Sequence, residues 1–386
     1  MLPNEEENDD YPQTCRSSTH GMSAEDVVST ESQNTQLSAG SAPQTSLDNA
    51  EKLPANIRFI GDLNPESALL SATSIRKPHQ NGIGVWHSDQ TEESEGRNMF
   101  TPASLFHTVS GCHQRLLSPI LLEQTCDTRP CQEDFQVLES FYLNNIHPIL
   151  PGISLPQYGK SQANTPERII QEQTICILAC TNVAVRSNLR LPGGAHQLTP
   201  TEFARKIVES MRLSIELALI SDRFIVIQAL TAMSLIIYSR ESIELAPQFF
   251  VRAVCQGLTL GLHQPGEEKR DEMVSGLFCY LWSIDRLQAA IQGRPVIMHT
   301  IDMAKSPLES ARGQEPGFRV FVFISVLLDK VIALYRPDAS LTEIPDGEFP
   351  SYEEVLTECG ALELPARLLG TCTHICRVLT LMLTIN

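Results

Sequence analysis

The sequence predicts an all-α protein, an irregular multi-helix bundle that follows a disordered acidic N-terminal tail. Three observations lead to this fold class. From residue 133 onward, apolar residues recur at the three- and four-residue spacing that gives a helix one buried face. Prolines, glycines and capping residues stand where these patterns begin and end. No stretch shows the two-residue alternation that would predict a convincing β-strand.

Composition divides the 386 residues into three parts. Residues 1–56 hold ten acidic and two basic residues and few large apolar ones, so they cannot bury enough surface to offset the entropy lost on ordering. We expect this tail to be disordered. Residues 57–132 are expected to be a mostly irregular linker segment, with a short extended piece at Ile57 and a small helix after Asn64. Residues 133–386 are expected to form one helical domain.

Four helices are predicted in the first half of this domain. The first spans Glu133–His147 and is followed by a proline, and the second begins after Thr165. The third begins after Thr199, where proline takes the first helical position and a glutamate completes a capping box. The fourth spans Phe224–Tyr238. Because it is apolar on most sides, we expect it at the centre of the bundle.

The other helices are organised around a pair of helices between Ala246 and Pro307. The first helix of the pair has a stripe at helical spacing, Phe250, Val254, Leu258 and Gly261. The second has its own stripe, Leu277, Leu281, Ile284 and Leu287. Asp285 and Arg286 are expected at the margin of this second stripe. Gly293 can adopt the left-handed conformation that ends a helix, and Pro295 cannot continue one.

Two more helices are predicted beyond this pair. Phe318–Tyr335 is strongly apolar, and a proline-rich loop over residues 337–351 follows it. Leu362–Ile385 is expected to be a final helix without a C-terminal cap.

Charge and cysteine content limit the function classes. The formal net charge of −17 repels phosphate and argues against a chain that wraps nucleic acid by itself. The 11 cysteines form no dense framework and no apolar signal peptide follows Met1, which indicates a reducing, intracellular compartment. The longest apolar run, Phe224–Tyr238, is too short for a membrane span, so we expect no membrane partner.

The helical pair carries a resemblance to a known family. Its ordered pieces are Ala253-Val254, Leu260-Gly261-Leu262-His263, Trp282, Asp285-Arg286 and Gly293-Arg294-Pro295. This string resembles the fungal-specific transcription-factor domain, the middle homology region that follows the zinc binuclear cluster in fungal regulators. Two further pieces are similar to that family's pattern: Phe59-Ile60-Gly61-Asp62-Leu63-Asn64-Pro65-Glu66 with Gly84-Val85-Trp86, and His147-Pro148-Ile149-Leu150-Pro151. The resemblance covers roughly residues 57–310.

The resemblance implies a fungal transcription regulator that acts on RNA polymerase II genes from the nucleus, for example on a metabolic or secondary-metabolite gene cluster. It implies that residues 133–386 are the helical regulatory domain, with proteins of the transcription machinery as partners and with a homodimer or a small effector as further options. DNA would be reached only indirectly, or through a zinc cluster that this chain lacks. The alternative is a helical small-molecule sensor or protein-interaction module that does not itself contact DNA.

The cysteines of this chain do not supply the family's zinc cluster. That cluster needs two C-x-x-C groups, and the sequence contains no C-x-x-C pair. A metal site could in principle be formed by Cys112, His113, Cys126 and Cys131, but their spacing in the sequence fits no zinc ribbon. Two pairs lie four residues apart on predicted helices, where buried packing is the expected role: Cys176 with Cys180, and Cys372 with Cys376. We therefore expect no metal-binding or cofactor-binding residues in this chain.

Candidate catalytic residues also have structural interpretations that we favour. His263 and Asp285 could in principle form an acid–base pair. However, His263 stands at a helix end, where it is expected to bond the last carbonyls. Asp285 and Arg286 are expected to form an ion pair that fixes neighbouring helices, and Arg294 is expected to donate to free carbonyls at a helix terminus. We expect no catalytic residues and no enzyme.

Overall fold

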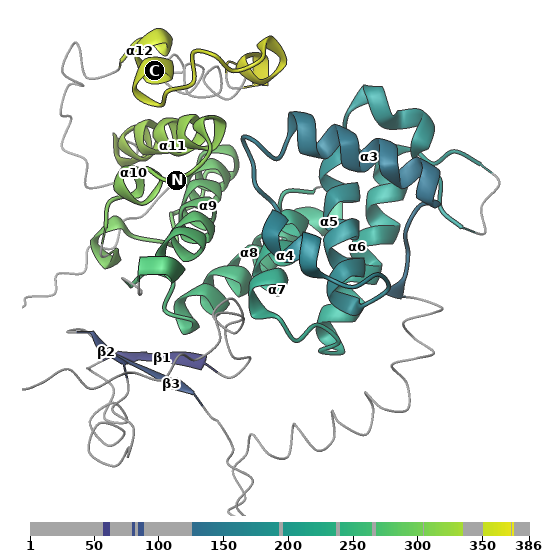
Figure 1. Ribbon diagram of the computed structural model, residues 1–386, viewed down its shortest axis with the longest axis horizontal. Coiled ribbons are helices and arrows are strands. Elements are labelled where there is room, and N and C mark those ends of the chain that lie inside the picture. The colour runs from purple at the N-terminus through teal and green to yellow at the C-terminus, as the bar shows by residue number, and fades with distance from the viewer. Residues whose placement is uncertain are drawn as a thin grey trace, which may run out of the picture. The chain divides into compact units, whose positions relative to one another are not determined.

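The computed structural model describes residues 57–61, 79–81, 84–88, 126–192, 196–236, 240–264, 268–303, 305–334, 350–371 and 373. The predicted acidic tail over residues 1–56 lies outside the described residues. So do Cys112, His113, Cys372 and Cys376, and most of the predicted final helix. In the described part, helices predominate, which confirms the all-α fold class (Figure 1).

The first group of helices packs around α5. Its members are α3 (Gln132–Asn145), α4 (Leu155–Lys160), α5 (Pro166–Ala179), the short 3-10 helix η3 (Val183–Asn188) and α6 (Pro200–Glu216). Helix α5 contacts both α3 and α6. The predicted helix starts are confirmed: the Thr165 side chain accepts from the Arg168 N–H, and Thr199 and Glu202 form a capping box.

Helix α7 (Arg223–Ser234) lies at the centre of the bundle. Every residue from Phe224 to Ser234 is buried, and α7 contacts α5, α6, α8 and α9. The Asp222 side chain caps it by accepting from the N–H groups of residues 224 and 225. The prediction of a central helix here is confirmed, because a helix that is apolar on all sides must be covered on all sides.

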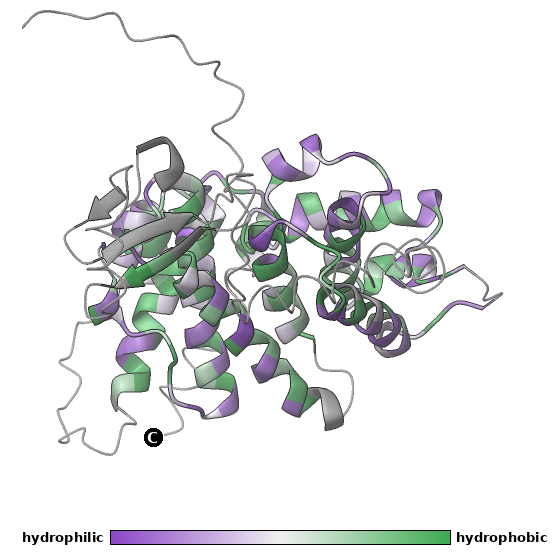
Figure 2. Cartoon of the chain, turned by 90° about the horizontal axis from the view of Figure 1, so that it is seen from below, coloured by the Kyte–Doolittle hydropathy of each residue, from purple (hydrophilic) through white to green (hydrophobic). Residues whose placement is uncertain are grey.

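The second group of helices contains the predicted pair, α8 (Arg240–Thr259) and α9 (Glu268–Gln292). Gly293 follows α9 with a φ value of +62°, which confirms the predicted left-handed stop, and Gly261 follows α8 with a φ value of +72°. The remaining members are η4 (Thr300–Asp302), α10 (Pro307–Ser310), α11 (Pro316–Leu334) and α12 (Tyr352–Glu358). Helix α11 contacts α9, α10 and α12. Figure 2 shows that hydrophobic residues concentrate on the sides of the helices that face one another.

The predicted stripe of α8 is wrong at Leu258, and its last member, Gly261, follows the helix instead of lying in it. Phe250 and Val254 are buried as expected, but Leu258 is exposed and its neighbour Gly257 is buried instead. A Cβ added to Gly257 would lie 3.2 Å from Cδ1 of Leu281, so α8 approaches α9 closely at this glycine. The buried face of α8 is therefore rotated away from Leu258.

Residues 57–88 contain a small sheet. The extended piece predicted at Ile57 is confirmed as its first strand, but the pairing into a sheet was not predicted. Strands β1 (Ile57–Gly61), β2 (His79–Asn81) and β3 (Gly84–Ser88) pair in the antiparallel order β1-β3-β2, with Phe59 opposite Trp86. Strand β1 contacts α8. Strands of three to five residues are too short to show clear alternation, and their pairing depends on partners elsewhere in the chain, so the local sequence could not predict the sheet.

Among the described helices, none is long and apolar enough to cross a membrane.

Candidate functional site

The Asp285–Arg286 cluster lies inside the second helical group. Its members are Asp285, Arg286 and Trp282 of α9, Asp329 of α11 and the backbone of residues 297–298. Only 2% of Asp285 and 1% of Arg286 is exposed. The expected place of both residues at the margin of the α9 stripe is therefore wrong. Buried charges of this kind persist only when they are paired and hydrogen-bonded.

Arg286 makes contacts in three directions. Its Nη1 donates to Oδ2 of Asp285 at 2.8 Å and to the carbonyl oxygen of Met298 at 2.6 Å. Its Nε donates to Oδ1 of Asp329 at 2.9 Å. The guanidinium carbon lies 4.2 Å from the centroid of the Trp282 ring, a cation–π arrangement. One side chain thus links α9, α11 and the segment that follows α9.

Asp285 completes the cluster from the same turn of α9. Its Oδ2 accepts from the backbone N–H of Met298 at 2.9 Å and of Ile297 at 3.0 Å. Burial raises the pKa of Asp285, while these N–H groups and Arg286 act in the opposite direction. Its carboxylate is saturated by fixed donors and shielded from solvent, an arrangement suited to holding the chain rather than to moving protons.

The cluster explains why the D-R and G-R-P pieces occur together. The left-handed Gly293 ends α9, and the chain then passes back along the helix, where Asp285 and Arg286 bind residues 297 and 298. The predicted ion pair that fixes neighbouring helices is confirmed. The prediction for Arg294 is wrong: its side chain is exposed, and its backbone N–H donates to the Ala289 carbonyl at 3.1 Å.

His263 has a different environment from the predicted one. Its ring meets the edge of the Phe59 ring of β1, with 5.2 Å between centroids and 89° between planes. Its Nδ1 is buried without a hydrogen-bond partner in the described part of the chain, so the expected bond to helix carbonyls is not made. Burial lowers the pKa of His263, and the nearby charge of Asp302 raises it. The partners of Asp285 are Arg286 and the N–H groups of residues 297 and 298, and His263 is not among them, so the structure does not bring His263 and Asp285 together as an acid–base pair.

His147, the first residue of the H-P-x-x-P piece, belongs to a second buried polar contact. Its Nδ1 lies 3.1 Å from the hydroxyl of Tyr142, which is fully buried. Burial lowers the pKa of His147 to about 4. The His147 ring is therefore uncharged in the folded protein at neutral pH, and it lies just after the end of α3.

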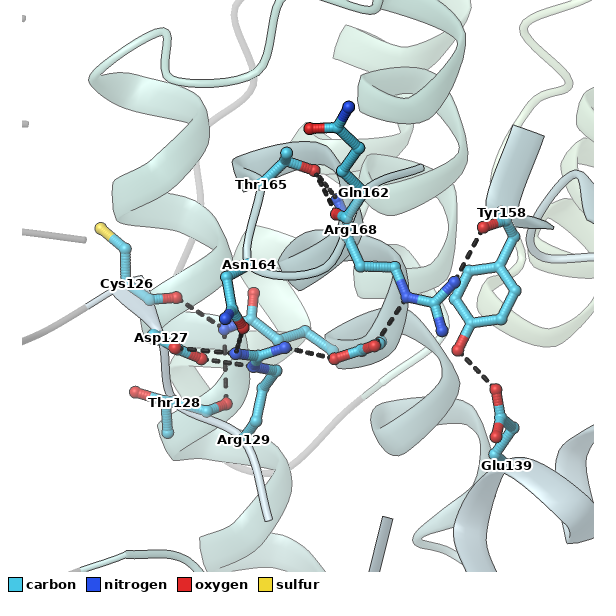
Figure 3. A network of polar contacts seen from close by, with 12 residues as sticks. Cys126, Asp127, Thr128, Arg129, Glu139, Tyr158, Gln162, Asn164, Thr165 and Arg168 are labelled. Carbon is cyan, nitrogen blue, oxygen red and sulfur yellow. Dashed lines mark hydrogen bonds and ion pairs between the residues drawn. The ribbon is translucent and has the colours of Figure 1, made fainter. Parts of the chain in front are cut away.

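A network around Arg129 was not anticipated from the sequence (Figure 3). Arg129 forms ion pairs with Asp127 and with Glu172 of α5. Glu172 also pairs with Arg168 at 2.7 Å, and the Arg168 guanidinium lies 3.5 Å from the centroid of the Tyr158 ring. Burial acts to lower the pKa of Arg129, but its two carboxylate partners raise it overall. Two contacts of the network are local in the sequence, the i,i+4 pair of Arg168 with Glu172 and the pair of Asp127 with Arg129, whereas Arg129 and Glu172 are 43 residues apart.

The same network holds residues 126–128 against the bundle through their backbone. Nε2 of Gln173 donates to the carbonyl oxygens of Cys126 at 2.8 Å and of Thr128 at 3.3 Å. The Ser210 hydroxyl of α6 also donates to the Cys126 carbonyl, at 2.8 Å. These donors replace the secondary-structure partners that an irregular segment lacks, and they fix where the chain enters the helical body.

The cysteines within the described residues behave mainly as core side chains. Cys176 and Cys180 are buried, as predicted, and burial raises the pKa of Cys180 to about 12. Cys126 is buried too, and Sγ of the exposed Cys131 donates to Oδ2 of Asp134 at 3.4 Å. In the described ranges, no three histidine, cysteine or acidic side chains are grouped so that they could hold a metal ion.

No family model, curated protein or solved structure matches this chain. A function therefore has to be inferred from its own residues and their geometry.

Proposed function

We propose that this chain is a regulator of transcription of RNA polymerase II genes, located in the nucleus, and that its helical domain controls this activity. The resemblance to the fungal-specific transcription-factor domain suggests the class. The observation that carries the proposal is the contact between Phe59 and His263. These residues belong to the two pieces of the family pattern that were identified separately in the sequence, and chance matches would have no reason to meet in the fold.

Two further contacts support the same proposal. Phe59 lies opposite Trp86 in the sheet, so the F-I-G and G-V-W portions of the N-terminal piece are neighbouring strands. Asp285 and Arg286 bind the segment that follows the G-R-P piece. The pieces thus act on one another inside a single fold. We infer that they specify the shape of a regulatory domain and that partners bind elsewhere on it.

Under this proposal the chain reaches DNA through a DNA-binding partner, or through a zinc cluster encoded outside this sequence. The net charge of −17 makes direct wrapping of DNA unfavourable, and the sequence lacks the C-x-x-C pairs of the cluster. Proteins of the transcription machinery are the proposed partners. A small effector that modulates the helical domain is compatible with this role.

Chromatin immunoprecipitation of the tagged full chain, combined with transcript profiles with and without its gene, tests the proposal. We expect the chain in the nucleus, at promoters of genes whose transcripts change, together with a DNA-binding protein. Arg286→Ala should reduce promoter occupancy because it destabilises the helical domain, and Arg294→Ala should leave occupancy unchanged. A stable chain that is confined to the cytosol, with unchanged transcripts after gene deletion, would overturn the proposal.

A further inference from the structure

Five serine or threonine residues of this chain directly precede a proline: Thr101, Ser118, Thr165, Thr199 and Ser306. This dipeptide is the minimal substrate motif of proline-directed protein kinases, and many of these kinases prefer a basic residue three positions after the phosphorylated one. Thr165 alone among the five meets that preference, in the string Thr165-Pro166-Glu167-Arg168. The other four have serine, leucine or glutamate at the same position.

The backbone at Thr165 has the conformation that such a kinase binds. Its φ and ψ values of −78° and 152° are extended, as expected for a residue that precedes a proline. Residues 162–164 are exposed, and the half-buried Thr165 donates its hydroxyl to the Gln162 carbonyl oxygen at 3.0 Å. Recognition of Arg168 requires the first turn of α5 to open, and the ends of helices are among the parts of a fold that open at the lowest free-energy cost.

Thr165 stands beside the Arg129 network (Figure 3). Nη2 of Arg129 donates to Oδ1 of Asn164, the residue before Thr165, at 3.2 Å. The side chains of Arg129 and Glu172 are only 18% and 12% exposed, so solvent screens their charges weakly. The ion pairs of the network join two arginines to two carboxylates, so its charges balance: Arg129 and Arg168 with Asp127 and Glu172.

We propose that Thr165 is the phosphorylation site of a proline-directed kinase and that its phosphate loosens the attachment of residues 126–129 to α5. In this reaction the Thr165 hydroxyl oxygen bonds to the γ-phosphorus of a nucleoside triphosphate. The bond from that phosphorus to the bridging oxygen breaks, the nucleoside diphosphate leaves, and the hydroxyl proton passes to the catalytic base of the kinase. The product carries an added charge of about −1.5 to −2 beside a network that was balanced.

The added charge weakens the ion pairs of Arg129. A phosphate on Thr165 competes with the two carboxylates for this guanidinium, and it also repels them. Neutral hydrogen bonds from Gln173 and Ser210 hold the same segment, but charge-assisted pairs are the stronger kind. Cys126, whose carbonyl accepts two of these neutral bonds, is fully buried in the unmodified chain. The reactivity of its thiol therefore reports whether the segment is released.

Phosphorylation of the purified full chain tests the site. A recombinant kinase of the cyclin-dependent class, supplied with Mg²⁺ and ATP, should phosphorylate Thr165 several-fold faster than Thr199 and Ser306, as read by peptide mass spectrometry. These two residues are matched internal controls, because each precedes a proline and caps a helix but lacks the basic residue. Thr165→Ser keeps the hydroxyl and should still be phosphorylated. Equal or faster phosphorylation of Thr199 or Ser306 would overturn the assignment.

Alkylation of the native thiols tests the consequence. After kinase treatment, iodoacetamide should modify Cys126 several-fold faster than before. Cys279 of α9, which is also fully buried, should stay protected and so show that the chain remains folded. In Thr165→Val the rate at Cys126 should be the same with and without kinase treatment. The proposed release is overturned if Cys126 of the phosphorylated chain stays as unreactive as Cys279, or if both thiols become reactive together, because that result reports unfolding.

Discussion

Replacing Arg286 by alanine is the sharpest test of the Asp285–Arg286 cluster. The change removes the bonds to Asp285, Asp329 and the Met298 carbonyl, and leaves the charge of Asp285 almost fully buried. Breaking a buried pair in this way costs about 3–5 kcal/mol. Asp285 keeps the N–H groups of residues 297 and 298, so we expect a value near the lower end, about 3 kcal/mol.

Thermal unfolding followed by far-UV circular dichroism measures this loss. For a helical body of this size, about 3 kcal/mol corresponds to a fall in Tm of about 6–12 °C. Arg294→Ala is the matched control on the same segment, because its side chain is exposed and its change should stay within about 0.5 kcal/mol. Arg286→Lys should recover little, since lysine lacks the planar fork that reaches several acceptors. An Arg286→Ala protein that melts with the Arg294→Ala control would refute the assignment of Arg286 as the link between α9 and α11.

Three other changes should have measurable effects. A Cβ added to Gly317 would lie 2.6 Å from the Pro148 carbonyl oxygen, so Gly317→Ala should lower stability by about 1–3 kcal/mol in urea unfolding. Thr199→Ala removes one half of the α6 capping box and should cost about 1 kcal/mol in the same assay. The pKa of His147 is lower in the fold than in the unfolded chain, so its contribution is complete above pH 6.5 and is lost as the pH falls toward about 4. His147→Gln should therefore flatten this acid-side decline in unfolding free energy by about 2–3 kcal/mol.

Each of these three changes has its own control. Gly159→Ala in α4 meets no atom within 4 Å and should be neutral or slightly stabilising; a loss equal to that of Gly317→Ala would contradict the close approach at Pro148. Thr201→Ala, two residues beyond the cap of α6, should cost much less than Thr199→Ala. His196→Gln changes an exposed histidine away from the Asp285–Arg286 cluster, and an equal flattening of the pH profile by this variant would remove the assigned role of His147.

Most helix positions could be predicted from local signals. A capping box at Thr199 and left-handed glycines at Gly261 and Gly293 act within one turn of the chain, so their sequence is enough to locate a helix end. The central place of α7 followed from the same kind of information, because a helix without a polar face must be covered on every side.

What each helix packs against was decided by the tertiary structure. The apolar face of α8 is wide, so periodicity could not show which part of it is buried, and Leu258 was placed wrongly. The buried guanidinium of Arg286 needs its ion pair with Asp329 of α11, and the half-buried guanidinium of Arg129 needs its ion pair with Glu172 of α5. The sequence by itself determined the all-α class and where helices begin and end, because capping and periodicity act over a few residues. Only the tertiary structure decided which charges are buried, which strands pair and which apolar face stays exposed, because these depend on partners that are distant in the chain.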